Sequence, residues 1–152
     1  MDSAGLQIRK ATRDDLPQVR SCAYAAFSKY LERIGKAPAP MNADFAAQID
    51  QGLIHVALRG RQFLGYTACY REGDHAHLDS IAVMPQHAGK GIGKLLLAHV
   101  ECAARLAGMR TVELYTNEAM VENVAMYQKL GYQELERKQH EGYRRVFFRK
   151  AL

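Results

Sequence analysis

The sequence has few of the features that mark secreted, membrane-spanning or metal-binding proteins. Its three cysteines, Cys22, Cys69 and Cys102, are odd in number and far apart, and no CxxC or Cys/His spacing points to metal ligands. We therefore expect reduced thiols and no metal site. No apolar stretch approaches the roughly 20 residues of a membrane span, and the first residues, MDSAGLQIRK, lack the pattern of a signal peptide. These absences predict a cytoplasmic protein without a membrane partner.

Long runs of one charge are also missing. The formal charge of the 152 residues is +5, but basic residues are spread along the chain, and their densest group is Arg144, Arg145, Arg149 and Lys150. Nucleic-acid-binding tails concentrate such residues. We therefore expect no nucleic-acid partner, and a solvated surface with a weak preference for anionic ligands.

Apolar spacing and turn residues predict one α/β domain over residues 1–152. A capping pattern, Thr12 to Asp15, separates a short first strand from a helix. Residues 28–50 combine two helical pieces with a structured loop. The elements expected after them are strands at 53–60, 62–73 and 75–83, a helix from 92, a strand at 110–116, a helix at 117–131 and a last hairpin that turns at Glu141 and Gly142.

Residues 83–97, VMPQHAGKGIGKLLL, lead from an apolar strand through three alternate glycines into a helix. Such a turn presents free backbone N–H groups and the positive end of a helix dipole, which suits a phosphate group. A nucleotide P-loop is excluded because Ala88 stands at the first glycine position and Leu95 at the magnesium-binding hydroxyl. A dinucleotide turn fails because its third glycine would be Lys94. The pattern indicates an anion site without naming the anion.

The segment LDSIAVMPQHAGKGIGKLLLAHV, residues 78–100, resembles the coenzyme A binding segment of the GNAT superfamily of N-acetyltransferases. In that family an apolar strand ending in Ala-Val leads through a proline to a Q/R-x-x-G-x-G/A turn and a helix. The turn falls here on residues 88–93, with Ala88 in place of the family's Gln or Arg and Gln86 two residues earlier. Because the turn binds mainly through backbone N–H groups, we expect this departure to weaken one contact rather than to abolish binding.

A second segment, NEAMVENVAMYQKLGY, is similar to the N-x-x-x-Y-x-K-L-G-F/Y helix of the same family. Its matching residues are Asn123, Tyr127, Lys129, Leu130, Gly131 and Tyr132. Together the two matches span residues 78–132 in the family's order. The resemblance implies the GNAT acyl-CoA N-acyltransferase fold: α/β, with a mixed, mostly antiparallel sheet of about seven strands flanked by helices on both faces.

Acetyl transfer from a thioester to an amine requires an unprotonated amine, because an alkyl ammonium with a pKa near 10.4 cannot attack. The strand HAHLDSIAV carries two candidate bases, His77 and Asp79, at positions where the family often has a histidine or carboxylate base. Period-two alternation places both on one face with His75, Ile81 and Val83. His77 is the first choice because an imidazole pKa near 6.5 suits a base, while Asp79 orients it or binds the amine. Equally, both could be polar residues on a half-exposed strand.

Tyr127 is the candidate general acid for the departing thiolate, by its match to the family's helix. A phenol with a pKa of about 10 stays protonated at neutral pH and can donate that proton. Asn123 lies four residues earlier, so one helix face presents both side chains. The alternative is a tyrosine that packs its ring into the core.

The resemblance further implies a set of residues that bind acetyl-CoA. The pantetheine arm would pair with the strand backbone, the Val83 N–H would support the thioester oxygen, and residues 88–94 would hold the pyrophosphate. The asparagines of the second segment would contact the pantetheine. The complete set is Ile81, Ala82, Val83, Ala88, Gly89, Lys90, Gly91, Ile92, Gly93, Lys94, Asn117 and Asn123.

The acceptor is expected across the sheet from the cofactor, beside residues 28–50. Tyr24, Tyr30 and Met41 are its candidate contacts, and Tyr143 and Arg144 are further ones; each could instead belong to the core or the surface. We therefore expect an acetyl-CoA dependent N-acetyltransferase that acetylates a primary amine of a small molecule or protein by direct attack in a ternary complex. The alternative is a non-catalytic acyl-CoA binding or sensing module of the same fold. The family also suggests a homodimer.

Overall fold

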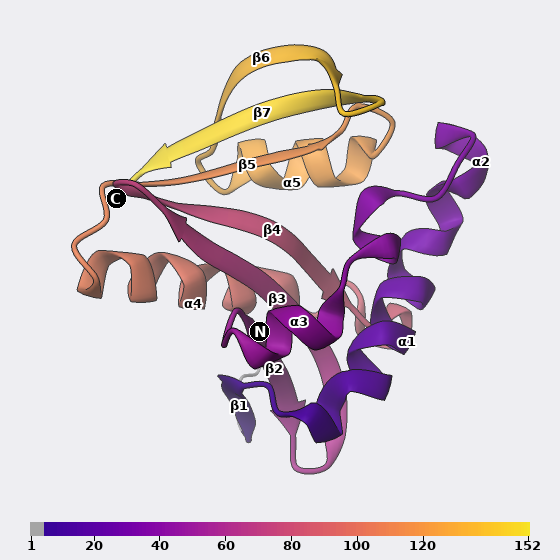
Figure 1. The fold of residues 1–152 in the computed structure, drawn as a ribbon, viewed down its shortest axis with the longest axis vertical. Helices are drawn as coiled ribbons and strands as arrows, with labels where there is room; N and C mark the ends of the chain where they lie inside the picture. Colours follow the sequence, from indigo (N-terminus) through magenta and orange to yellow (C-terminus); the bar gives the residue numbers. More distant parts are fainter. Residues whose placement is uncertain (1–4) are drawn as a thin grey trace.

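Seven strands form one sheet with helices on both faces in the computed structural model, which describes residues 5–152 (Figure 1). The strands lie in the order β1-β2-β3-β4-β5-β7-β6, and every neighbouring pair is antiparallel except β4 and β5, which are parallel. This order confirms the predicted mixed, mostly antiparallel sheet. The strands are β1 (Leu6–Lys10), β2 (Ile54–Arg59), β3 (Gln62–Glu72), β4 (His75–Val83), β5 (Thr111–Asn117), β6 (Gln133–His140) and β7 (Tyr143–Ala151), and the α-helices are α1 (Leu16–Phe27), α2 (Leu31–Ile34), α3 (Phe45–Asp50), α4 (Ile92–Leu106) and α5 (Val121–Lys129).

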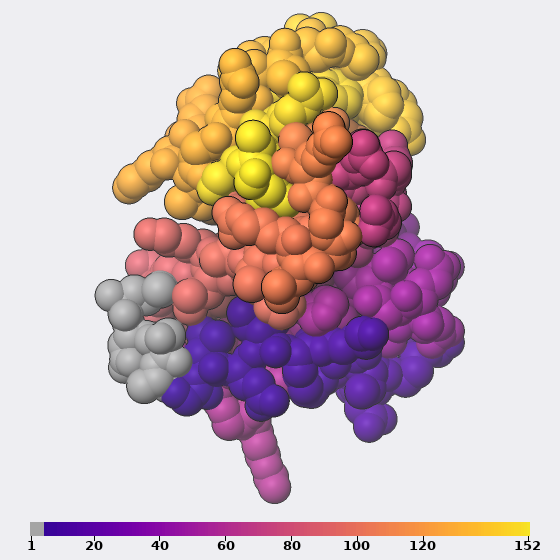
Figure 2. Space-filling view, turned by 90° about the vertical axis from the view of Figure 1, so that its left-hand side faces the viewer, coloured from indigo at the N-terminus to yellow at the C-terminus, as the bar shows by residue number. Residues whose placement is uncertain are grey.

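Each face of the sheet has its own hydrophobic core. Helices α1 and α3 bury Val19 and Phe45 on one face, and α4 and α5 bury Leu96 and Val124 on the other. A second view shows the C-terminal hairpin (gold to yellow) and the N-terminal segment (indigo) at opposite ends of the molecule (Figure 2). The later part of the chain, from α4 to α5, lies between them on that side.

The predicted capping pattern joins β1 to the first helical turn. The Thr12 N–H donates to Asp15 Oδ2 at 2.7 Å, and the Arg9 guanidinium donates to both carboxylate oxygens at 2.8 and 3.0 Å. The hydrogen bonds from Arg9 lower the pKa of the buried Asp15 carboxyl because they stabilise its ionised form. This pair fixes the direction in which the chain leaves the first strand.

Strand β4 contains a β-bulge at Asp79. Ser80 pairs with Ala68 of β3 and Leu78 pairs with Cys69, so Asp79 has no partner of its own on β3. An inserted residue of this kind bends the strand and shifts the alternation of its side chains. The faces of β4 before and after the bulge are therefore exchanged.

The bulge makes the expected alternation of β4 wrong. Ile81 and Val83 pack on the α4 side of the sheet together with Leu78. His75 and His77 precede the bulge and alternate with residues of that same core, so they point to the other face. The strand presents its histidines and its last two apolar side chains on opposite faces.

Residues 28–50 contain less helix than expected. Helix α2 has only four residues, and 3₁₀ turns at Ser28–Tyr30 and Ala39–Asn42 take up much of the segment before α3. Within residues 5–152, no helix is long and apolar enough to cross a membrane.

A glycine on β3 sets how closely β3 and β4 approach. A Cβ added to Gly65 would press on the backbone oxygen of Ala82 and lie 3.2 Å from the Val83 Cα.

We expect Gly65→Ala to lower the free energy of unfolding by about 1–3 kcal/mol, the usual cost of overpacking, as measured by urea denaturation. Gly93→Ala is the control, because its Cβ would meet only Val83 Cγ2 at 3.7 Å. Equal stability of the Gly65→Ala variant and the parent chain would contradict the close approach.

Candidate functional site

The candidate site begins where β4 and β5 separate. The two strands pair only from His75 to Leu78 and from Thr111 to Leu114. Beyond these pairs β4 follows β3 and β5 follows β7, so a gap opens between two strands that are each held from the other side (Figure 1). The last residues of β4, 79–83, border this gap.

The open edge of β4 presents backbone groups to the gap. The Met84 N–H donates to Leu64 O of β3 at 2.8 Å, and successive residues of a strand direct their N–H and C=O groups to opposite edges. The backbone groups of Ile81 and Val83 therefore face the gap, where β5 provides no partner. The backbone of Ala82, the third residue predicted here, faces β3.

The glycine turn connects this end of β4 to the N-terminus of α4. Gly89 and Gly91 have φ values of 79° and 81°, the left-handed region that favours glycine. The backbone N–H groups of residues 89–94 donate to no acceptor in the part of the chain that the structure describes. Nothing lies within 4 Å of a Cβ built on Gly89. The turn is an open group of backbone donors at the positive end of a 15-residue helix, and exposed Lys90 and Lys94 add positive charge.

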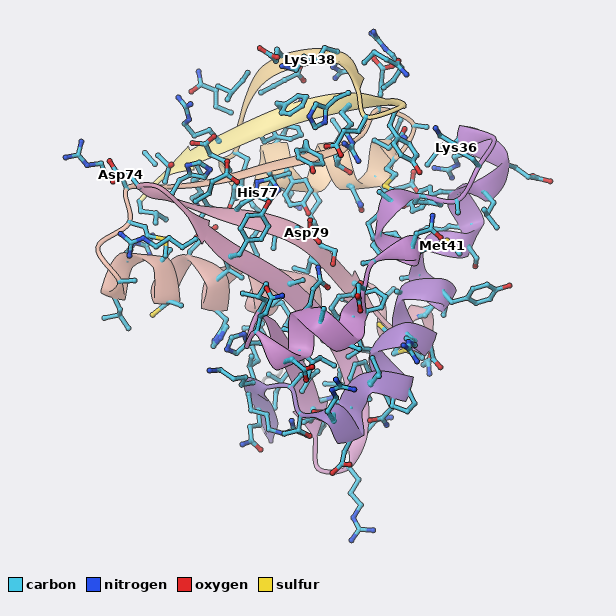
Figure 3. The ribbon with its side chains drawn as sticks, in the orientation of Figure 1. Lys36, Met41, Asp74, His77, Asp79 and Lys138 are labelled. Carbon is cyan, nitrogen blue, oxygen red and sulfur yellow. The ribbon has the colours of Figure 1, made fainter. Side chains whose placement is uncertain are left out.

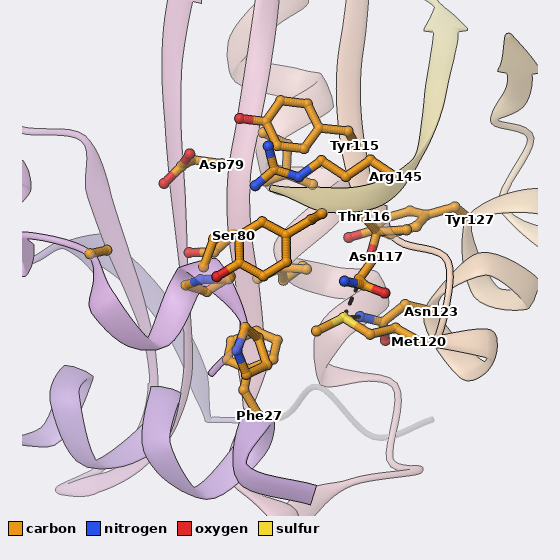
Figure 4. A pocket seen from close by; sticks show the side chains of 17 residues that line it. Phe27, Asp79, Ser80, Tyr115, Thr116, Asn117, Met120, Asn123, Tyr127 and Arg145 are labelled. Atoms are coloured by element: carbon orange, nitrogen blue, oxygen red, sulfur yellow. Dashed lines mark hydrogen bonds between the residues drawn. The ribbon is translucent and has the colours of Figure 1, made fainter. Parts of the chain in front are cut away.

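A pocket is lined by both sides of the gap and by the N-terminal segment (Figure 4). Phe27 and the loop from Pro38 to Ala43 form one wall. The other lining residues come from β4, the end of β5, the start of α5 and β7: Leu78, Asp79, Ser80, Ile81, Tyr115, Thr116, Asn117, Met120, Asn123, Tyr127, Tyr143 and Arg145. Five of the predicted functional side chains, those of Asp79, Asn117, Asn123, Tyr127 and Tyr143, are thus together in one pocket.

Tyr127 is buried in the pocket wall, with 4% of its surface exposed. Its ring packs against Tyr132 and Phe148 at centroid distances of 5.7 and 5.8 Å. Its hydroxyl has no hydrogen-bond partner among residues 5–152. Burial raises the pKa of Tyr127 above its usual value, so the phenol carries its proton at neutral pH.

The two asparagines lie beside Tyr127 at the same side of the pocket (Figure 4). Asn117 Oδ1 accepts the Ala119 N–H at 2.9 Å, which fixes the side chain at the end of β5. Asn123 Nδ2 makes only a long contact of 3.7 Å to Met120 Sδ. Both amides therefore retain hydrogen-bonding capacity toward the pocket.

The two candidate bases lie in different hollows. Asp79 lines the pocket and accepts a hydrogen bond from Gln48 Nε2 at 3.1 Å. His77 is buried between the rings of Tyr70 and Tyr115, at centroid distances of 5.0 and 5.1 Å, and lines a second hollow. Figure 3 shows His77 on β4 farther from the N-terminal helical segment than Asp79. Burial lowers the pKa of His77 below its usual 6.5, and its Nε2 has no hydrogen-bond partner in the described chain.

Of the residues predicted to contact the acceptor, Tyr143 lines the pocket, whereas Tyr24, Tyr30 and Met41 do not. Tyr24 is 65% exposed, because α1 buries Ala23 and Phe27 and turns Tyr24 toward solvent. Tyr30 is buried and donates its hydroxyl to Glu122 Oε2 at 3.3 Å. Met41 is half-buried against the core beneath α1 and α3 (Figure 3). The loop that these residues border does reach the pocket, through Pro38 and its neighbours.

Arg145 and Tyr115 line the pocket and were missed by the sequence analysis, which named Arg144 instead. A signal was present in the segment YRRVFF. Val146 and Phe148 are core residues of β7, so alternation assigns Arg145 to the face opposite them and Arg144 to theirs. Arg144 is 56% exposed and pairs with Glu118 at 3.6 Å, outside this pocket.

Contacts beside the pocket join segments that are distant in the sequence. The Tyr143 hydroxyl donates to Ala37 O at 2.8 Å, and Lys36 Nζ donates to Gly142 O at 2.6 Å. Arg33 pairs with Glu122 at 2.6 Å. These contacts hold the N-terminal loop to the C-terminal hairpin and to α5.

Three possible metal ligands gather at the second hollow. One ligand atom each from Glu72, His75 and His77 lies within 4.8 Å of the others. A structural zinc site uses four ligands, and this group offers three.

A sequence model of the acetyltransferase (GNAT) family matches residues 17–132. The [ribosomal protein bS18]-alanine N-acetyltransferase of Haemophilus influenzae is 30% identical over 79 residues, which are 52% of this chain and 53% of that protein. The match therefore spans about half the length of this relative.

Solved structures share the whole fold. The PaiA N-acetyltransferase from Thermoplasma acidophilum, in complex with coenzyme A, has a TM-score of 0.82 and 18% identity, covering 97% of this chain and 99% of that chain. The ribosomal-protein-S18-alanine N-acetyltransferase from Escherichia coli has a TM-score of 0.77 and 20% identity, covering 96% and 93%. At these identities the likeness shows the fold alone.

One buried and two half-buried histidines predict an acid-sensitive fold. Burial lowers the pKa values of His77, His55 and His99 in the folded chain below their usual 6.5. The unfolded chain then binds more protons below that pH, so stability is complete above about pH 6.5 and falls as the pH drops through 6.5 toward the folded pKa values. Urea denaturation between pH 7.5 and 5.5 measures this loss. His77→Gln should reduce the slope of stability against pH, whereas Tyr115→Phe, which removes no imidazole from the same cluster, should leave the slope unchanged; an unaltered slope in His77→Gln would contradict the assignment.

Proposed function

The chain belongs to the acetyltransferase (GNAT) family, and on this premise we propose that it transfers the acetyl group of acetyl-CoA to a primary amine. One observation carries the proposal. The separation of β4 from β5 leaves an open backbone edge beside Tyr127, at the end of β4 that leads into the glycine turn. Such an arrangement offers donors for an extended amide chain, for an anion and for a leaving group within one region.

The residues present fit coenzyme A. The unpaired N–H groups of residues 89–94, with Lys90 and Lys94 beside them, suit a pyrophosphate. The backbone of Ile81 and Val83 suits the amide groups of a pantetheine arm, which can pair with a strand edge as another strand would. Asn117 and Asn123 supply amides of their own. When bound, acetyl-CoA supplies an activated acetyl group as a thioester.

The reaction forms a C–N bond and breaks a C–S bond. The amine nitrogen attacks the carbonyl carbon of the thioester in a ternary complex, the amine loses one proton, and the departing sulfur gains one, giving an N-acetyl amine and the free thiol. The Val83 N–H faces the gap and would stabilise the charge that develops on the carbonyl oxygen. The protonated Tyr127 phenol would supply the proton to the sulfur.

Asp79 is the group best placed to receive the amine. It lines the pocket and has no cationic partner within 4 Å in the described chain. It would hold the incoming ammonium and accept its proton directly or through water. His77, the first choice from the sequence, lies in the second hollow behind Tyr115, so we assign it no proton transfer.

A screen for free thiol release tests the enzyme against the binding module. Acetyl-CoA is incubated with polyamines, amino acids, aminoglycosides, arylalkylamines and peptides, including peptides that begin with alanine, the acceptor residue named for the Haemophilus influenzae relative. Thiol release with any acceptor supports the enzyme. Coenzyme A binding by calorimetry without thiol release across the panel supports the module.

The proposed setting of this reaction is the cytoplasm. Cys22, Cys69 and Cys102 are all free thiols, as in a reducing compartment. The homodimer stays a prediction, to be measured by light scattering.

Tyr127→Phe should lower kcat by about 100-fold, the lower part of the range for general-acid catalysis, because the variant cannot protonate the leaving sulfur. Coenzyme A affinity by calorimetry should stay close to that of the parent chain, since the ring is retained. Tyr132→Phe is the matched control: its hydroxyl donates to Glu101 at 2.9 Å outside the pocket, and its ring packs on Tyr127. Unchanged turnover of Tyr127→Phe would rule out the general-acid role.

Gly89→Ala should weaken coenzyme A binding about tenfold, a free-energy change near 1.4 kcal/mol, because a methyl group would enter the anion cradle. Gly60→Ala is matched to it, because both glycines have positive φ and nothing within 4 Å of an added Cβ. Backbone strain is therefore similar in the two variants, and calorimetry should find weaker binding only in Gly89→Ala. Equal affinity of both variants would contradict a phosphate site at the turn.

A further inference from the structure

Arg145 is a buried cation in the wall of the pocket. Only 7% of its side chain is exposed. The guanidinium carbon lies 4.2 Å from the Tyr115 ring centre and 5.1 Å from that of Tyr143. Planar guanidinium groups stack well on such rings, so the head group is held in one position before any ligand arrives.

The hydrogen-bonding capacity of Arg145 is only partly used. Nη1 donates to His140 Nδ1 at 2.8 Å and to Glu141 Oε1 at 3.4 Å. The Glu141 side chain is 66% exposed, and exposed pairs of this kind contribute little. Nε and Nη2 have no acceptor among residues 5–152. A guanidinium carries five N–H donors, so the N–H groups on Nε and Nη2 stay available to an anionic ligand.

An unpaired acid faces the same pocket. Asp79 accepts one hydrogen bond, from Gln48, and forms no ion pair in the described chain. Figure 4 shows the guanidinium of Arg145 extending into the pocket toward the side on which Asp79 lies. The two charges are not within 4 Å of each other, since no ion pair joins them. The pocket thus presents a negative and a positive group with room between them.

Resting on the proposed function, we propose that the acceptor is an amine that also carries a carboxylate. Its carboxylate binds the Arg145 guanidinium, which lies against the rings of Tyr115 and Tyr143, and its ammonium binds Asp79 beside the open edge of β4. A neutral analogue leaves Nε and Nη2 of Arg145 without an anionic acceptor, and sites built to pair a polar group discriminate strongly against analogues that lack it. Free amino acids and peptides with an acidic residue next to the N-terminus both have this chemistry.

The test compares acids with their amides on the unmodified chain. Glycine, β-alanine, L-alanine and 5-aminopentanoate are assayed for thiol release beside the corresponding amides, and alanine peptides with Asp in second place beside those with Asn. We expect kcat/KM for at least one acid to exceed that of its amide about tenfold or more, mainly through KM. If the preference appears among the free amino acids, the acceptor is a free amino acid. If it appears among the alanine peptides, the acceptor is an acidic peptide.

A binding measurement separates this inference from the proposed enzyme function. Calorimetry in the presence of coenzyme A compares each N-acetylated acid with its N-acetylated amide, which requires no turnover. Tighter binding of an acid without thiol release from any amine would refute the enzyme and support the carboxylate site. Equal binding and equal kcat/KM within every pair would overturn the carboxylate site, whether or not thiol is released.

Variants assign the preference to Arg145. Arg145→Met keeps the length of the side chain and should lower kcat/KM for the acids about tenfold more than for their amides, so that the preference for acids is lost. Arg145→Lys should restore part of the preference. Arg144→Met is the matched control, because Arg144 is the next residue and pairs with Glu118 instead. Loss of the preference to the same extent in Arg144→Met would overturn the assignment. If Arg145→Met does not fold, the acid–amide comparison on the unmodified chain decides the proposal.

Discussion

The separation of β4 and β5 is the constraint on which the site depends. A parallel pair normally satisfies the inner edges of both strands, but here the pairing stops at Leu78 and Leu114. Each strand stays in place beyond that point because its other edge is paired, β4 with β3 and β5 with β7. Backbone groups that would otherwise form a sheet ladder are left without a strand partner, and this is the edge to which we assign an extended ligand. The same gap lets the α4–α5 side of the sheet and the α1 side share one pocket.

The bulge at Asp79 lies at the point where the strands part, and it decides what each face of β4 offers. Before it, His77 points into an aromatic cluster; after it, Ile81 and Val83 turn their side chains into the core beneath α4. Their backbone groups can then face the gap without an apolar side chain in the way of an acceptor. The sequence held a signal for this shift, because the apolar spacing in HAHLDSIAV changes from two to three between Leu78 and Ile81. The prediction that His77 and Ile81 share one face assumed that side chains alternate at every residue of the strand, and an inserted residue breaks that alternation.

The local structure of the glycine turn and of the Asn123–Tyr127 helix was predictable from the sequence. On the side assigned to the acceptor, the sequence pointed to Asp79 and Tyr143, which line the pocket, but not to the rest of the wall. The glycine turn and the Asn123–Tyr127 helix depend on local spacing, which sets backbone geometry within a few residues. The N-terminal wall is built from short turns with little periodicity, held by contacts to residues about ninety to a hundred positions away, such as Arg33 to Glu122 and Tyr143 to Ala37. Tyr24, Tyr30 and Met41 were chosen from composition, and only the tertiary contacts show that they turn away from the pocket.

The two halves of the pocket also differ in what a change of residue would do to them. The groups assigned to the donor are largely backbone N–H groups on a strand edge and at a helix start, and they persist when side chains change. The acceptor half consists of side chains, with Asp79 and Arg145 as its charges, beside the hydrogen bonds that join the N-terminal loop to the C-terminal hairpin. Substitution of Arg145 alters the charge offered to the acceptor without touching the backbone that would hold the donor. A fold divided in this way can keep one acetyl donor while its acceptor is set by a few side chains in the loop, the hairpin and the bulge.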